Sequence, residues 1–88
     1  MNYKLEIIKE TNAAVLIVSG ILSAKSAIEI DRFCKETTGN IRIDVKNVTG
    51  YDTEGARFIK EISKKGVILT GVSPFLSLLI AEQASDSE

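Results

Sequence analysis

The 88-residue chain is predicted to fold as an α/β domain, with the element order β-β-α-β-α-β-α and a four-stranded mixed sheet. Its hydrophobic content of 44% and charged content of 26% are ordinary for a globular protein. Apolar residues repeat with period two in some segments and with helical period in others, and the two kinds of segment alternate. Right-handed crossovers between neighbouring strands should place the helices mainly on one face of the sheet.

The first two strands are expected to form a hairpin. Apolar and charged residues alternate from Tyr3 to Ile7, which predicts a half-buried strand. Thr11 and Asn12 suit a turn, and residues 13–20 then form a continuous apolar run that ends at a glycine. This run predicts a strand buried on both faces.

The first helix is expected to begin at Ser26, because Glu29 follows it at the spacing of a capping box. Gly39 provides a stop. One face of this helix carries the apolar residues Ala27, Ile30, Phe33 and Cys34. We therefore interpret Cys34 as a small core residue.

The middle of the chain predicts a strand, a loop and a second helix. Apolar and polar residues alternate over 41–46, and 47–52 then read as a loop. Helical periodicity follows over 53–65, with the inner stripe Ala56, Ile59 and Ile62, and Gly66 ends it.

The last elements are a strand over 67–72 and a helix that starts with Ser73 as N-cap and Pro74 at the first helical position. The apolar run after Pro74 is broad, so part of it is expected to remain exposed for a partner. We predict one domain over residues 1–82 and a frayed polar tail over 83–88.

Composition argues against several classes of function. A net charge of −1 gives no basic surface for nucleic acid. The absence of histidine removes the usual base and metal ligand, and a single cysteine rules out an internal disulfide or a thiolate metal cluster. Because the chain has neither a secretory pattern nor an apolar run of about 18 residues, we expect a cytoplasmic protein without direct membrane insertion.

The segment YDTEGARFI, residues 51–59, holds the candidate site. Asp52 and Glu54 could act as a catalytic pair, but their spacing at a helix start does not favour converging carboxylates. Neither a serine elbow nor a phosphate-binding glycine motif accompanies them. Thr53 as N-cap and Glu54 in the first turn would explain a plain helix start. A plain helix start does not explain Gly55. A glycine there suggests that another part of the protein packs closely against the backbone or that a ligand approaches it.

The order and spacing of short motifs resemble the STAS domain family, named for sulfate transporters and anti-sigma factor antagonists. The resemblance covers about residues 1–82. It rests on Gly20, Ser26, Ala27, Asp44, Asp52, Thr53, Glu54, Gly55, Gly71, Val72, Ser73 and Pro74.

This resemblance implies a regulatory protein-interaction domain that is neither an enzyme nor a binder of cofactor or metal. In anti-sigma factor antagonists the residue before the turn glycine is phosphorylated by a partner kinase. Here that residue is Glu54, so either Glu54 acts as a fixed charge or Thr53 is the candidate phosphoacceptor. The expected regulatory and partner-binding residues are Asp52, Thr53, Glu54, Gly55, Arg57, Lys60 and Lys64.

Two alternatives remain open. Thr53 in this turn also resembles the small STAS subunit of phospholipid-type ABC transporter complexes, whose partner would be a transporter ATPase. A small nucleotide-binding protein that uses Asp52 is the third reading. The resemblance further implies a minimal form that lacks the last strand and helix of the family. The sheet edge is then either bare or covered by a partner, which favours a complex or a homo-oligomer.

Overall fold

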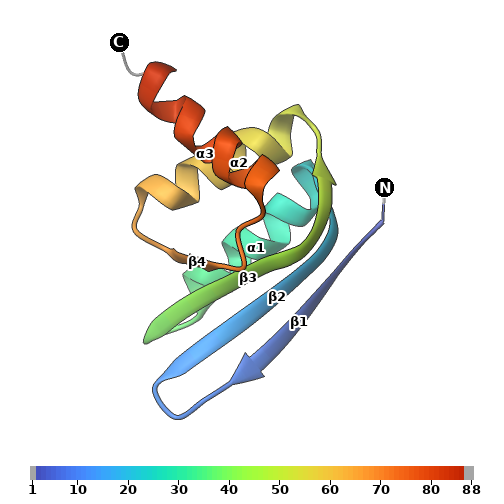
Figure 1. Cartoon of the computed structure of the whole chain (residues 1–88). Helices are drawn as coiled ribbons and strands as arrows, with labels where there is room; N and C mark the ends of the chain where they lie inside the picture. The colour runs from blue at the N-terminus through green and yellow to red at the C-terminus, as the bar shows by residue number, and fades with distance from the viewer. Residues whose placement is uncertain (1, 87–88) are drawn as a thin grey trace.

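The computed structural model of the chain describes residues 2–86, and its side chains through Ala81. The order of elements agrees with the prediction (Figure 1). The elements are β1 (Tyr3–Lys9), β2 (Ala13–Leu22), α1 (Ala24–Glu36), β3 (Asn40–Tyr51), α2 (Thr53–Lys64), β4 (Ile68–Thr70) and α3 (Pro74–Asp86).

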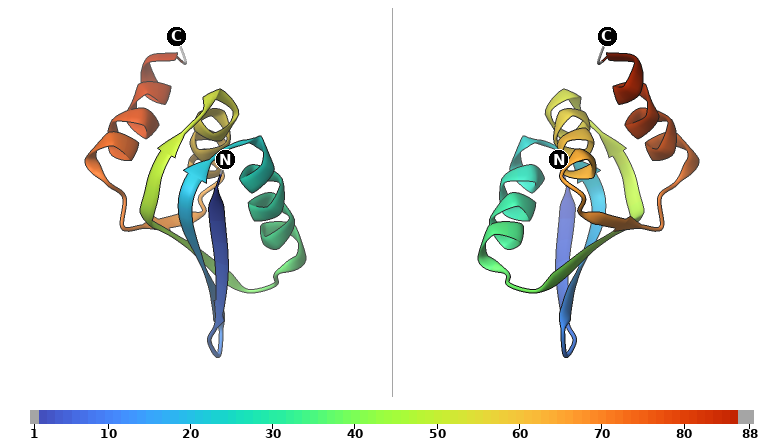
Figure 2. Two further views of the ribbon diagram at one scale, coloured as in Figure 1. Left: turned by 90° about the vertical axis from the view of Figure 1, so that its right-hand side faces the viewer. Right: turned by 90° about the vertical axis from the view of Figure 1, so that its left-hand side faces the viewer.

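The four strands form one mixed sheet in the order β1-β2-β3-β4. β1 runs antiparallel to β2, whereas β2, β3 and β4 are parallel to one another. The three helices lie side by side in front of the sheet in the right-hand view of Figure 2, and the left-hand view shows the opposite face without a helix over it. The predicted fold class and the one-sided helix layer are therefore confirmed.

The core lies between this helix layer and the sheet. Leu16 and Ile43 are neighbours in adjacent strands and are almost fully buried. The helices contribute Ile30, Ile59, Ile62, Leu76 and Leu79 to the same apolar cluster. The predicted inner faces of α1 and α2 are correct, since Phe33, Cys34 and Ala56 pack against this cluster and Ala27 is half-buried.

Strand β2 differs from its prediction, because only one of its faces is buried. Leu16 and Val18 point toward the helices and have at most 1% of their surface exposed. Val15 and Ile17 point to the other face and are only half-buried, since no described helix covers that face (Figure 2). The expectation of burial on both faces is wrong because the helices cover only one side.

Strand β3 is longer than predicted and includes most of the expected loop over 47–52. It continues to Tyr51, which pairs with Leu22 of β2. Two register shifts interrupt the pairing, one between Ile17 and Ser19 and one before Ile21. Such bulges let an irregular, glycine-containing segment stay paired at the end of a sheet.

The starts of two helices also differ from the prediction. α1 is capped by Ser23, three residues before the expected Ser26. Ser26 instead occupies the third helical position, where its hydroxyl accepts the N–H of Ser23 at 2.8 Å. α2 is capped by Asp52 rather than Thr53, which is its first helical residue. In both cases the true cap is the residue that directly follows a strand end.

The last helix begins at Pro74, as predicted, but the hydroxyl of Ser73, its expected N-cap, is buried without a hydrogen-bond partner among the described residues. The strand before it is shorter than the predicted range 67–72. The helix continues through Asp86, so it includes residues 83–86 of the tail that was expected to be frayed. Residues 87–88 lie outside the described residues. Among the helices of residues 2–86, none combines the length and the apolar composition that crossing a membrane requires.

Candidate functional site

Asp52 fixes the backbone where β3 passes into α2. Its carboxylate Oδ1 accepts the N–H of Gly55 at 2.8 Å, and its carbonyl accepts the N–H of Ala56 at 2.9 Å. Its own N–H donates to the carbonyl of Leu22 at 3.0 Å, which ties the turn to the end of β2. The side chain therefore acts as a helix cap, which is a structural task that occupies the carboxylate.

Gly55 is buried because the start of α2 packs directly on the end of β2. A Cβ atom at this position would lie 2.0 Å from the carbonyl oxygen of Leu22 and 2.4 Å from its carbonyl carbon. Both neighbours are backbone atoms, so they cannot move aside as a flexible side chain could. Close packing against Leu22 thus accounts for a glycine that the sequence alone left unexplained.

Thr53 and Glu54 project from this fixed turn and are exposed. Glu54 forms an ion pair with Arg57, one turn further along α2, at 2.7 Å. Both side chains are at least half exposed, so the pair contributes only a few tenths of a kcal/mol. The first turn of the helix therefore presents one hydroxyl and one carboxylate to solvent on a backbone that Asp52 and Gly55 hold in place.

A shallow groove of about 750 Å³ runs beside this turn between α2 and α3. It brings together four of the seven predicted site residues, while Glu54, Gly55 and Lys64 do not line it. Lys64 lies in the last turn of α2, roughly 16 Å along the helix from Thr53 at 1.5 Å per residue. The groove is lined by Tyr51, Asp52, Thr53, Ala56, Arg57, Lys60 and Leu79.

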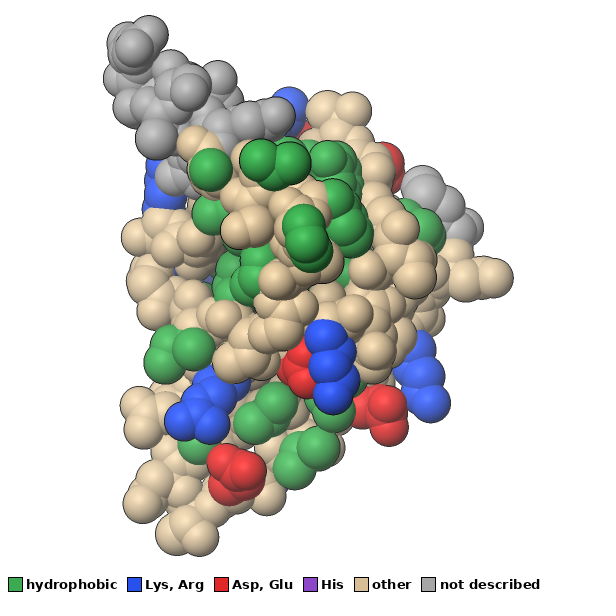
Figure 3. Space-filling view, in the orientation of Figure 1, with side chains coloured by type: hydrophobic (Ala, Val, Ile, Leu, Met, Phe, Trp, Pro, Cys, Tyr) green, Lys and Arg blue, Asp and Glu red, His purple; other side chains and the backbone are tan. Residues whose placement is uncertain are grey.

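An aromatic pair beside the groove was not predicted from the sequence. The rings of Tyr51 and Phe75 stack with their centroids 6.0 Å apart. Tyr51, Phe75 and Leu78 are 40%, 38% and 70% exposed, so they form an apolar patch next to the turn. Figure 3 shows apolar side chains gathered over α3 and the neighbouring end of β3. The exposure of Phe75 and Leu78 agrees with the expectation that part of the apolar run after Pro74 stays uncovered. The stacking partner Tyr51 was missed because residues 47–52 were predicted as a loop.

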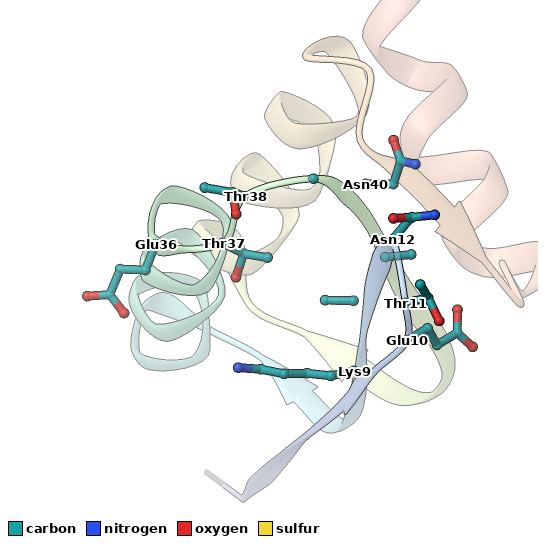
Figure 4. Close-up of a pocket in the computed structure, with 11 residues that line it drawn as sticks. Lys9, Glu10, Thr11, Asn12, Glu36, Thr37, Thr38 and Asn40 are labelled. Atoms are coloured by element: carbon teal, nitrogen blue, oxygen red, sulfur yellow. The ribbon is translucent and has the colours of Figure 1, made fainter.

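A second hollow lies at the opposite end of the sheet, where the β1–β2 turn meets the end of α1 and the start of β3. It has a volume of about 630 Å³ and is open to solvent. Figure 4 shows that the carboxylates of Glu10 and Glu36 point away from one another. Because open α/β sheets bind ligands at the carboxyl ends of their parallel strands, the turn at Asp52 is the stronger candidate.

Cys34 does not provide a nucleophile. Burial raises the pKa of the Cys34 thiol, the nearby carboxylate of Asp31 raises it further, and Lys65 partly opposes both effects. A thiol with a raised pKa is protonated near neutral pH, and the thiolate is the reactive form. The half-buried position agrees with the interpretation of Cys34 as part of the core.

Comparison with known proteins adds information on the fold alone. Neither a family model nor a curated protein matches the chain. Among solved structures, the chain is similar to the crystal structure of Mglu, with a TM-score of 0.55 and 21% sequence identity. The match covers 73% of this chain and 18% of Mglu, so the chain spans a small part of that protein's length.

Proposed function

We propose that the chain is a non-enzymatic STAS-type interaction domain, similar to an anti-sigma factor antagonist, that works in a partner-switching complex. One observation carries the proposal: the start of α2 exposes Thr53 and Glu54 on a backbone that is fixed from both sides. We call this region, with its groove, the turn surface; it consists of Tyr51, Asp52, Thr53, Glu54, Arg57, Lys60, Phe75 and Leu78.

The chemistry of the turn surface supports binding rather than catalysis. The Asp52 carboxylate already accepts a hydrogen bond from the helix backbone, and Glu54 is paired with Arg57. General acid–base catalysis by two carboxylates needs groups that converge on one substrate atom. A rigid exposed helix start beside a basic and apolar groove suits recognition of another protein.

The charge at this helix start is the basis of the proposed switch. Negative charge is favoured at a helix N-terminus, and a phosphate adds about −1.5 to −2 charges. Glu54 supplies one such charge permanently. A phosphate on Thr53 would add to it on the rim of the groove that Arg57 and Lys60 also line. Partner binding should therefore respond to changes at either residue.

Affinity capture from the native host tests this proposal. Wild-type bait is compared with Glu54→Ser, Thr53→Val and a Lys25→Ala control on exposed α1, and captured proteins are identified by mass spectrometry. Recovery of a kinase or sigma-factor regulator by wild type and control, with altered recovery by the two turn variants, is the expected result. Equal recovery by all four baits would contradict the role of the turn surface.

The second candidate is an accessory subunit of a phospholipid-type ABC transporter complex. Two observations favour it: Thr53 is exposed in the turn, and α3 leaves Leu78 largely uncovered. In the same capture experiment, recovery of a membrane ATPase in place of a kinase would select this reading. Calorimetry with ATP and GTP tests the nucleotide-binding reading, which predicts a heat of binding that Asp52→Asn removes.

The state of Thr53 can be measured directly. Intact mass of the protein purified from its native host, followed by peptide mapping, shows whether a phosphate is present on this residue. A phosphate at Thr53 supports the switch at that hydroxyl. If the protein is unmodified under all growth conditions, the switch cannot involve a phosphate on Thr53 and would depend on the fixed negative charge of Glu54.

A further inference from the structure

The outer edge of β1 is unpaired among the described residues, because β1 contacts only β2 within the sheet (Figure 1). The Ile21 N–H donates to the Asn2 carbonyl at 3.0 Å, and the Glu10 N–H donates to the Ala13 carbonyl at 2.8 Å. Antiparallel strands alternate the direction of their backbone groups. The even-numbered residues of β1 therefore bond to β2, and the odd-numbered ones direct N–H and C=O outward.

The side chains along this edge divide by face. Tyr3, Leu5 and Ile7 lie on the helix side, where Ile7 is 54% exposed. Leu5 and Ile7 line a groove of about 470 Å³ against α1. Lys4 and Glu6 lie on the opposite, open face, with side chains that are 70% and 54% exposed. The edge thus offers outward backbone groups and the exposed side chains of Ile7 and Ile8. It also carries Lys4, Glu6 and Lys9, of which Lys4 and Glu6 lie 3.9 Å apart as an exposed ion pair within the chain.

We propose that two copies of this chain pair along β1, antiparallel and centred on Leu5, so that their sheets become continuous. In this register Leu5 faces the partner's Leu5. Tyr3 faces the partner's Ile7, and Lys4 faces the partner's Glu6. The outward backbone groups of Tyr3, Leu5 and Ile7 then find partners, as in a regular antiparallel ladder.

The charges of Lys4 and Glu6 favour a second copy of this chain as the partner of β1, and they favour one register of the pairing. Lysine on an edge strand normally discourages pairing, but here a glutamate two residues later makes the strand complementary to itself. Opposite charges across strands stabilise, and like charges directly opposite destabilise. A register centred on Glu6 would place two glutamates opposite each other. A register centred on Ile7 would place Lys9 against the partner's Leu5, and it would pair Lys4 only with the partner's Glu10, which lies past the end of β1.

The other edge of the sheet fits self-pairing less well. β4 contains only three residues, Ile68–Thr70, and carries no charged side chain to set a register. β1 is more than twice as long. The sequence suggested a homo-oligomer at the edge left by a missing last strand, and the pairing proposed here lies at β1 instead. Because the turn surface belongs to α2, α3 and the end of β3, a β1 pair leaves both copies of that surface accessible.

Sedimentation equilibrium over a range of protein concentrations tests the pairing through a charge reversal. Wild type is expected to show a monomer–dimer equilibrium. Lys4→Glu places two like-charged pairs across the interface and should raise the dimer Kd by about tenfold or more. Lys4→Glu/Glu6→Lys restores both attractions and should restore the dimer. A wild type that stays monomeric overturns the proposal, as does a dimer that Lys4→Glu does not weaken.

A backbone variant provides a second test. Ile7→Pro removes an outward N–H that the ladder to β2 does not use, as proline is tolerated on such edges. The variant should be folded by circular dichroism and monomeric by sedimentation equilibrium. A folded Ile7→Pro protein that still dimerises through the same concentration range would exclude β1 as the interface.

Disulfide trapping fixes the register. In a Cys34→Ala background, Leu5→Cys should cross-link rapidly under oxidising conditions, because directly opposed residues have Cα atoms about 5.5 Å apart, within disulfide range. Ile7→Cys lies off the two-fold axis and should cross-link slowly. Faster cross-linking of Ile7→Cys, or equal rates for both, would overturn the register centred on Leu5.

Discussion

The two helix starts at the carboxyl ends of the parallel strands differ, although they are neighbours and each follows directly after a strand. α1 follows β2 and α2 follows β3, and the last residues of these strands, Leu22 and Tyr51, are paired. At α1 the capping serines are buried, with Ser26 fully covered. At α2 the cap is half-buried. The two residues after the cap are exposed at both starts, Ala24 and Lys25 at α1 and Thr53 and Glu54 at α2. The capping side chains of the first start, the sealed start, are therefore buried, and it exposes an alanine and a lysine, whereas the second, the open start, has a half-buried cap and exposes a hydroxyl and a carboxylate.

This difference separates two tasks that one motif can perform. Ser23 and Ser26 bond to each other's backbone and leave no polar group for a ligand. Asp52 satisfies the helix start alone, which releases Thr53 and Glu54 from any structural duty toward the backbone. The two starts therefore differ in the number of side chains that cap them and in the chemistry of the two residues that they expose. Four variants, from the largest expected effect to the smallest, test this division.

The largest effect is expected at Gly55, where the open start touches the sheet. Gly55→Ala forces a Cβ against the Leu22 carbonyl and should lower the free energy of unfolding by about 3 kcal/mol. Urea denaturation followed by circular dichroism measures this loss. Gly50→Ala is the matched control, since its Cβ would meet only the side chain of Ile21 at 3.3 Å. Equal losses in both variants would contradict the packing argument.

The sealed start should be the more sensitive of the two to loss of its polar side chain. Ser26→Ala leaves the buried N–H of Ser23 without its acceptor and should cost about 2 kcal/mol in unfolding free energy. Ser26→Cys, which retains the approximate volume, serves as comparison. A cost below that of an exposed serine, measured with Ser77→Ala, would show that the buried bonds do not stabilise α1.

Loss of the open cap should cost less, about 1 kcal/mol for Asp52→Ala. Asp52→Asn keeps an oxygen that can accept the Gly55 N–H, so it should recover most of this loss. Thermal unfolding of the two variants beside wild type measures the difference. If alanine and asparagine destabilise equally, the carboxylate has a role other than capping.

The smallest effect on stability is expected at Glu54. Glu54→Gln breaks an exposed pair with Arg57 and should change the unfolding free energy by less than about 0.5 kcal/mol. Partner recovery should change nonetheless, because glutamine removes the fixed charge. Stability and capture measured on the same preparation separate the two effects. A large loss of stability without a change in recovery would assign Glu54 to the fold.

The order of elements could be predicted because the spacing of apolar residues along a short segment decides which face of a helix or strand can be buried. The caps could not be predicted reliably, since Ser23, Ser26, Asp52 and Thr53 all have capping chemistry and the choice depends on where a strand ends. The strand over 47–51 was missed because its pairing with β2 involves bulges. Such irregular pairing depends on distant residues rather than on local pattern.

The candidate site was predictable in part for the same reason. Exposure of Thr53 and Glu54 follows from helix position, so the sequence could indicate them. The packing of Gly55 on Leu22 and the stacking of Tyr51 on Phe75 join residues far apart in the chain. Periodicity carries no information on such contacts. Lys64 was included by helix face alone, and its distance from the turn separates it from the groove.

The contact between Gly55 and Leu22 also divides the turn into positions that tolerate substitution and positions that do not. Asp52 and Gly55 frame two positions whose side chains contribute little to the fold. Over evolutionary time, mutations at Thr53 and Glu54 could exchange one partner for another while the domain stays folded. For the same reason, a library randomised at these two positions should yield mostly folded proteins, which makes the turn a suitable place to engineer new specificities.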